Sequence, residues 1–254
     1  MDKELFELAI RASLDIEINT GIGTMSEKRV HSTLKYYVSP DMDFHEKKYC
    51  GFVCDAVTEQ SVFEIQSRAF DRLRRKLDKI LPDFPLTVVY PVIRERMIIL
   101  TDESTGETVK RKSPKKGSIY SVIPELYKVR SYLHHPNFYL RLITISAIDH
   151  RVKTLCKKNT YKRYKPKNYT KHELIPSEIH SDITLSRPDD YTIFIPKGLP
   201  EEFLSSDFAI AAHIPRTVAS TTLLILSDIG LVKRIARKKE GYLYCLDNKK
   251  PFRL

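Results

Sequence analysis

Residues 86–93, LTVVYPVI, form a continuous apolar run, which is typical of a strand covered on both faces of a sheet. A second run, FYLRLITISAI, predicts another long strand at residues 138–148. The other predicted elements up to about residue 150 are helices at 1–15, 27–38, 68–81 and roughly 119–133, strands at 47–57 and 61–66, and a hairpin at 96–112. Because helices alternate with strands, we predict an α/β protein with a mixed sheet flanked by helices.

The composition is that of a folded protein, since 42% of the residues are hydrophobic and 30% are charged. No apolar run reaches the roughly 18–20 residues that a membrane helix needs. The first residues, MDKELFELAIRASLD, predict a charged amphipathic helix rather than a signal peptide. Cysteines 50, 54, 156 and 245 form neither a disulfide framework nor a CxxC pair. We therefore expect a cytoplasmic protein that does not bind a membrane.

The formal net charge of +11 is concentrated in one segment. Residues 151–175 contain nine Lys or Arg residues and one acid, and three tyrosines lie among these cations. Cations neutralise phosphates and aromatic rings stack on bases, so the segment favours a nucleic-acid partner. The alternative is a solvated basic linker. We predict a first domain at residues 1–155, a basic connector at 156–198 and a C-terminal domain at 199–254.

The stretch SVFEIQSR places Glu64 and Gln66 on a strand whose neighbouring residues are apolar. An acid on a buried strand costs free energy unless it is paired. If the preceding turn has an even number of residues, Ala56 pairs with Phe63 and Asp55 lies directly opposite Glu64. We therefore expect two carboxylates to share one surface of this hairpin.

Neighbouring carboxylates repel each other, and a divalent cation removes the repulsion. Carboxylate oxygens are hard ligands that suit Mg²⁺ or Mn²⁺, so Asp55 and Glu64 are the predicted metal ligands. The structural alternative makes Asp55 an edge or turn residue and pairs Glu64 with Arg68 or Arg72.

The order of a helix acid at Glu27, a strand acid at Asp55, a tight turn and Glu64-x-Gln66 before a helix resembles the PD-(D/E)xK nuclease superfamily. The resemblance implies a restriction endonuclease-like sheet in which Asp55 and Glu64 bind Mg²⁺ and a lysine helps to activate water for phosphodiester hydrolysis. Glu27 matches the helix acid of many members, with a charge that favours its helix N-terminus as the alternative. Gln66 stands where lysine is usual. Lys35 is a candidate for the missing positive charge, with a solvated surface lysine as the alternative.

The C-terminal residues predict a short helix at 208–213, a turn, a helix at 216–229 that ends at Gly230, and a hairpin with a basic tip. This arrangement resembles a winged helix-turn-helix, which implies that the second helix enters the major groove and the wing contacts the DNA backbone. The predicted nucleic-acid contacts are Arg216, Thr217, Ser220 and Thr221 in the helix, Arg234, Arg237, Lys238 and Lys239 in the wing, and Lys162, Arg163 and Lys165 in the connector. The alternative is that this domain packs on the first one or mediates self-association.

These features predict a Mg²⁺- or Mn²⁺-dependent DNA endonuclease, which would act as a homodimer if it cuts both strands. A second hypothesis is a non-catalytic DNA-binding protein, a regulator or recombination accessory on a decayed nuclease fold, and Gln66 favours it. A third is a protein whose C-terminal domain binds another protein.

Overall fold

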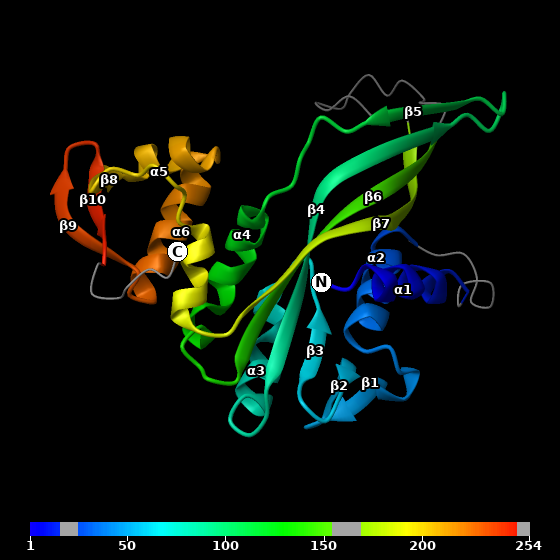
Figure 1. Ribbon diagram of the computed structural model, residues 1–254, viewed down its shortest axis with the longest axis horizontal. Coiled ribbons are helices and arrows are strands. Elements are labelled where there is room, and N and C mark those ends of the chain that lie inside the picture. Colours follow the sequence, from blue (N-terminus) through cyan, green and yellow to red (C-terminus); the bar gives the residue numbers. More distant parts are fainter. Residues whose placement is uncertain (16–24, 154–168, 248–254) are drawn as a thin grey trace, which may run out of the picture.

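A computed structural model describes residues 1–15, 25–153 and 169–247 (Figure 1). The helices are α1 (Lys3–Asp15), α2 (Met25–Val38), α3 (Arg74–Ile80), α4 (Ile123–Leu126), α5 (Ser205–Ala212) and α6 (Arg216–Asp228). The strands are β1 (His45–Tyr49), β2 (Phe52–Val57), β3 (Val62–Ile65), β4 (Leu86–Thr101), β5 (Thr108–Lys112), β6 (Phe138–Lys153), β7 (Tyr169–Leu185), β8 (Glu202–Leu204), β9 (Val232–Lys238) and β10 (Gly241–Leu246).

The main sheet has seven strands in the order β1-β2-β3-β4-β6-β7, and β5 pairs with the far half of β4. β4 is parallel to β3 and to β6, whereas the other neighbouring strands are antiparallel. Helix α3 lies in the connection between the parallel strands β3 and β4. Parallel neighbours need such a crossover connection, whereas antiparallel neighbours can be joined by a turn alone. The predicted α/β class and the mixed sheet flanked by helices are confirmed.

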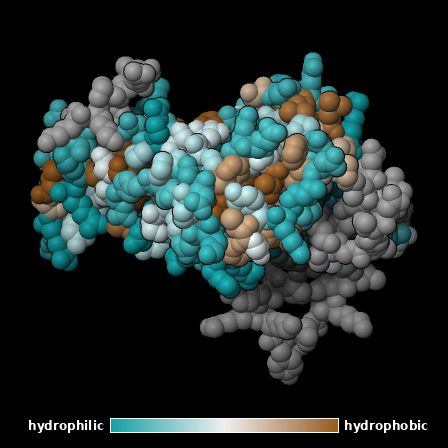
Figure 2. Space-filling view, turned by 90° about the horizontal axis from the view of Figure 1, so that it is seen from below, coloured by the Kyte–Doolittle hydropathy of each residue, from teal (hydrophilic) through white to brown (hydrophobic). Residues whose placement is uncertain are grey.

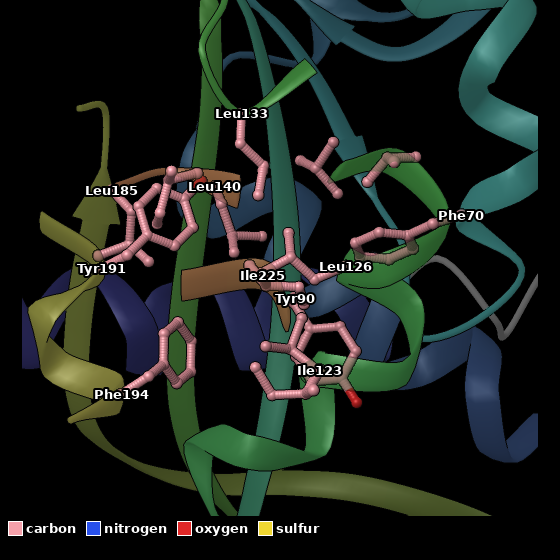
Figure 3. Packing of buried hydrophobic residues seen from close by; sticks show 14 of the residues in the cluster. Phe70, Tyr90, Ile123, Leu126, Leu133, Leu140, Leu185, Tyr191, Phe194 and Ile225 are labelled. Atoms are coloured by element: carbon pink, nitrogen blue, oxygen red, sulfur yellow. The ribbon is translucent and has the colours of Figure 1, made fainter. Parts of the chain in front are cut away.

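Alternation along the central strands builds a separate apolar core on each face of the sheet. Val89 and Ile143 face α1 and α2, where they pack with Phe6 and Leu34. On the opposite face, side chains such as those of Tyr90 and Leu140 pack with α3, α4 and the C-terminal elements (Figures 1 and 3). Burial of each such large apolar side chain contributes about 1.5–3 kcal/mol, so both helical layers hold the sheet in place.

The run at residues 47–57 is a hairpin and not the single strand that its composition predicted. Tyr49 pairs with Phe52 across a two-residue turn. Both turn residues have positive φ, 47° at Cys50 and 82° at Gly51, which is the geometry of a type I′ turn. Because the turn reverses the chain, β1 becomes the edge strand of the sheet and β2 lies beside β3.

The predicted connector at residues 156–198 is largely part of the fold. Tyr169–Leu185 is strand β7, which pairs with β6 along its length. A short 3₁₀ segment follows at Pro188–Phe194 and buries Tyr191 and Phe194 in the core (Figure 3). Residues 156–168 lie outside the described residues.

The C-terminal module, residues 202–247, contains a second sheet in the order β8-β10-β9 beside helices α5 and α6. It belongs to the same apolar cluster as the main sheet, because Phe203, Phe208 and Ile225 join Leu126 of α4 in that cluster. In the described ranges no single helix is long and apolar enough to cross a membrane, although α5 and α6 together meet that criterion with a bend of 108° between them.

Candidate functional site

The β2–β3 hairpin has the register that the sequence predicted. Ala56 pairs with Phe63 and Val57 pairs with Val62. The turn is closed by a 3.0 Å hydrogen bond from the Thr58 N–H to the Ser61 carbonyl, which leaves two residues at its tip. The even turn therefore brings the next pair of positions, Asp55 and Glu64, opposite each other.

The carboxylate of Asp55 links three elements around this point. Its Oδ2 accepts a 2.7 Å hydrogen bond from the Ile65 N–H of β3 and lies 3.0 Å from His31 Nε2 of α2. Burial alone would raise the pKa of Asp55, but the hydrogen bond and charge of His31, together with the Ile65 N–H, hold that pKa below its usual value. Asp55 is therefore an ionised carboxylate at the junction of β2, β3 and α2.

Glu64 is buried, and its carboxylate forms an ion pair with a lysine that the sequence analysis did not select. Its Oε1 lies 2.5 Å from Lys76 Nζ of α3, and the same ammonium donates a 2.9 Å hydrogen bond to the Val53 carbonyl. Burial and the charge of Asp55 raise the pKa of Glu64, while Lys76 opposes the rise. The structural alternative of an ion pair is thus realised, but the partner is Lys76 instead of Arg68 or Arg72.

The sequence predicted three other residues for this site, namely Gln66, Lys35 and Glu27. The Gln66 amide donates a 2.6 Å hydrogen bond to the Arg68 carbonyl, so its nitrogen is engaged by its own loop. Lys35 is paired with Glu46 at 2.5 Å and does not supply the missing charge. Glu27 lies in the first turn of α2, outside the residues whose side chains the structure describes.

We call Asp55 and Glu64, with His31 and Lys76, the carboxylate site. Both hydrogen bonds to Asp55 use Oδ2, so within the described residues Oδ1 keeps its lone pairs for another partner. No group of three or more His, Cys, Asp or Glu side chains with the spacing of a metal site occurs in the described part of the chain. Two protein carboxylates are nevertheless enough for Mg²⁺, which keeps several waters and takes further oxygens from a substrate phosphate.

The thiol of Cys54 is buried beside the carboxylate site. Burial raises the pKa of its thiol to about 11, and the charge of Glu64 adds to the rise. Because the thiolate is the reactive form, we predict that iodoacetamide alkylates the exposed Cys50 faster than Cys54 by about tenfold or more. Mass spectrometry of peptides from partly alkylated protein measures both rates. Equal rates would contradict the burial of Cys54 beside Glu64.

The C-terminal module presents the predicted cationic and hydroxyl side chains at its surface. Arg216, Thr217 and Ser220 are exposed and Thr221 is half-buried in the first turns of α6. The Arg216 guanidinium donates a 2.9 Å hydrogen bond to the Glu240 carbonyl, which ties the start of α6 to the β9–β10 turn. In the view of Figure 2 this module, on the left, shows mainly hydrophilic side chains.

The β9–β10 hairpin carries the other predicted cations of this module. The guanidinium carbons of Arg234 and Arg237 lie 4.4 Å and 5.6 Å from the centre of the Tyr242 ring, and Lys238 and Lys239 are exposed beside them. Stacking on the ring restricts the motion of both arginine side chains, which are exposed. The predicted contacts Lys162, Arg163 and Lys165 lie outside the described residues.

The sequence profile of a family described as a domain of unknown function (DUF8091) matches residues 28–186, more than half of the chain. The chain belongs to this family. The DUF8091 region contains Asp55, Glu64 and Lys76 and ends before the C-terminal module. An uncharacterized protein of Treponema pallidum (strain Nichols) is 30% identical over 189 residues, which are 74% of this chain and 73% of that relative. No solved structure matches the chain.

Proposed function

We propose that this protein is a metal-dependent DNA endonuclease of the PD-(D/E)xK type. The observation that carries the proposal is the pair of acids at opposed strand positions, Asp55 on β2 and Glu64 on β3, with the charge of Asp55 acting on Glu64 and the ammonium of Lys76 beside Glu64. Helix α2, the strand that bears Asp55, the tight turn, the strand that bears Glu64 and helix α3 follow one another in the order that the resemblance implies. A restriction endonuclease-like sheet is therefore the fold that we propose for the DUF8091 region.

Each residue of the carboxylate site has a proposed role. Asp55 and Glu64 would hold Mg²⁺ or Mn²⁺, and the ion would polarise the scissile phosphate and lower the pKa of a bound water. Lys76 opposes the rise in the pKa of the buried Glu64, and its ammonium would supply the positive charge that Gln66, at the position of the motif lysine, lacks. His31, whose Nε2 lies 3.0 Å from Asp55 Oδ2, would orient this carboxylate.

The C-terminal module is proposed to act as a winged helix-turn-helix that positions duplex DNA. In support, α5 and α6 are joined by a sharp turn, and the β9–β10 hairpin follows them with four cations near its tip. In such a fold Arg216, Thr217, Ser220 and Thr221 would reach base edges, while the cations of the hairpin would contact phosphates. Cleavage of both strands would use two copies of the chain, one for each strand.

Replacing Lys238 and Lys239 by alanine should weaken DNA binding and reduce its salt dependence. Each phosphate contact that is lost lowers the slope of log K against log salt by about 0.9. Fluorescence anisotropy with a labelled duplex at several salt concentrations measures this slope. The control is Lys47→Ala with Lys48→Ala, two exposed lysines of β1. An equal effect of both double variants on the slope would show that DNA binding depends only on the net charge of the protein.

One observation favours the second candidate, a DNA-binding protein that does not cleave. The Gln66 amide is bound to the Arg68 carbonyl, so this residue does not replace the motif lysine in the described geometry. The deciding experiment incubates the purified protein with supercoiled plasmid and with branched DNA in Mg²⁺, Mn²⁺ or chelator. Metal-dependent strand breaks support the nuclease, whereas tight binding without breaks on any substrate supports the second candidate.

A further inference from the structure

A hollow of about 250 Å³ lies on the sheet extension that we call the arm. The arm consists of β5 with the far halves of β4, β6 and β7, and it projects beyond the helices (Figure 1). Cations and hydroxyl groups predominate in the lining of the hollow, which includes Arg96, Lys112, Ser113, Lys116, Ser146 and Ser177. These are the side chains that bind oxyanions in proteins.

The loop after β5 is fixed against β4 at both of its ends. The Ser113 N–H donates a 2.8 Å hydrogen bond to the Arg96 carbonyl, and the Gly117 N–H lies 3.2 Å from the carbonyl oxygens of Ile93 and Arg94. A Cβ atom on Gly117 would lie 2.3 Å from the Ile93 carbonyl oxygen, so no other residue allows this approach. The loop therefore holds its two lining residues, Ser113 and Lys116, at the hollow, which lowers the ordering cost of binding.

The charges of the lining favour an anion. Lys112 and Lys116 are exposed, and neither forms an ion pair with the described residues. Arg96 lies 3.6 Å from Asp149, which partly neutralises it, and Glu95 contributes one exposed carboxylate to the lining. The Ser146 hydroxyl lies 2.7 Å from His180 Nε2. Among the described residues, the ammonium groups of Lys112 and Lys116 thus remain available for a negative ligand.

We propose that this hollow is a phosphate-binding site. Its volume lies below the roughly 300–1,000 Å³ of pockets that enclose drug-sized molecules, so it suits one phosphate group better than a whole cofactor. The phosphate can belong to a nucleic-acid backbone or to a small molecule. In the first case the arm is a second contact for the DNA proposed above, and in either case the site does not depend on cleavage.

The test is a ¹H–¹⁵N NMR titration of the full chain with inorganic phosphate at constant ionic strength. The backbone amides of Ser113, Lys115 and Gly117 should shift saturably. The double variant Lys112→Ser, Lys116→Ser should bind phosphate about tenfold more weakly or worse, because two charge-assisted hydrogen bonds are lost. Gly117→Ala keeps every charge but displaces the loop, and it should also weaken binding.

The matched control is Arg111→Ser. Arg111 is an exposed cation of β5 that pairs with Ile98, whereas Lys112 pairs with Met97 of the lining, so Arg111 alternates to the other face. Equal amide shifts with chloride and with phosphate would overturn the proposal, and so would a loss of phosphate affinity in Arg111→Ser as large as that in the Lys112→Ser, Lys116→Ser double variant. A short DNA duplex that shifts the same amides and competes with phosphate identifies a backbone phosphate, and a duplex without this effect identifies a small phosphorylated ligand. Because the readout is binding, failure here is distinct from failure of the nuclease.

Discussion

Asp55→Asn should reduce metal-dependent DNA cleavage by about 10²–10³-fold, the usual cost of removing one preorganised electrostatic group from an active site. The asparagine oxygen can still accept the hydrogen bond from the Ile65 N–H, so the junction of β2 and β3 is kept, but the charge that would hold the cation is lost. DNA affinity should change by no more than about twofold, because the proposed binding surface lies in the C-terminal module. Nicking of supercoiled plasmid and anisotropy measure the two effects.

The matched control is Asp182→Asn. Asp182 is another half-buried carboxylate of the sheet, held by Arg141 at 2.6 Å and by the Tyr37 hydroxyl at 2.9 Å. Its neutralisation should lower stability without changing the cleavage rate of the folded protein. If both variants lose cleavage only in proportion to their unfolded fraction, Asp55 has a structural role and the proposed metal site is wrong.

Lys76→Met should destabilise the protein by about 3–5 kcal/mol, because it leaves the buried carboxylate of Glu64 without its partner. The double variant Glu64→Met, Lys76→Met should recover most of that loss, since apolar side chains of similar volume replace a buried ion pair at little or no cost. Urea unfolding of the three proteins tests this coupling. Additive effects of the two substitutions would contradict the ion pair.

The loss of stability in Lys76→Met should depend on pH. The pKa of Glu64 is raised in the folded protein, so this group favours folding at low pH and its contribution is lost as the pH rises through the folded-state pKa. Asp55, whose pKa is lowered, contributes in the opposite sense, and its stabilisation is lost as the pH falls. Removal of Lys76 raises the pKa of Glu64 further, so Lys76→Met should be less destabilised near about pH 5 than near about pH 8. The same destabilisation at both values would contradict a charged Glu64.

The opposed positions of the two acids were predictable because the register of the hairpin depends on local features. An even turn at Glu59 and Gln60 and the alternation of the flanking strands suffice to place Asp55 opposite Glu64. Lys76 was not predictable in the same way. It lies 12 residues from Glu64, and its contact depends on how α3 packs across the sheet. Sequence alone shows the basic side of that helix but not which cation turns inward.

Two other differences have physical causes that single-sequence patterns hide. The β1–β2 turn uses Cys50 before Gly51, and cysteine is not one of the residues that usually mark a type I′ turn. Strand β7 is the last strand in its sheet, and much of it is exposed, so its polar and basic residues resemble a linker. The neighbouring central strands are covered on both faces, and their continuous apolar runs predicted them well.

The most direct test of the carboxylate site compares the wild type with the Glu64→Met, Lys76→Met variant on supercoiled plasmid in Mg²⁺ and in chelator. The variant is expected to be folded but to lack both a metal ligand and the adjacent ammonium. Our account predicts strand breaks by the wild type in Mg²⁺ alone, with none by the variant under either condition. Breaks by both proteins, or binding without breaks by the wild type, would contradict it.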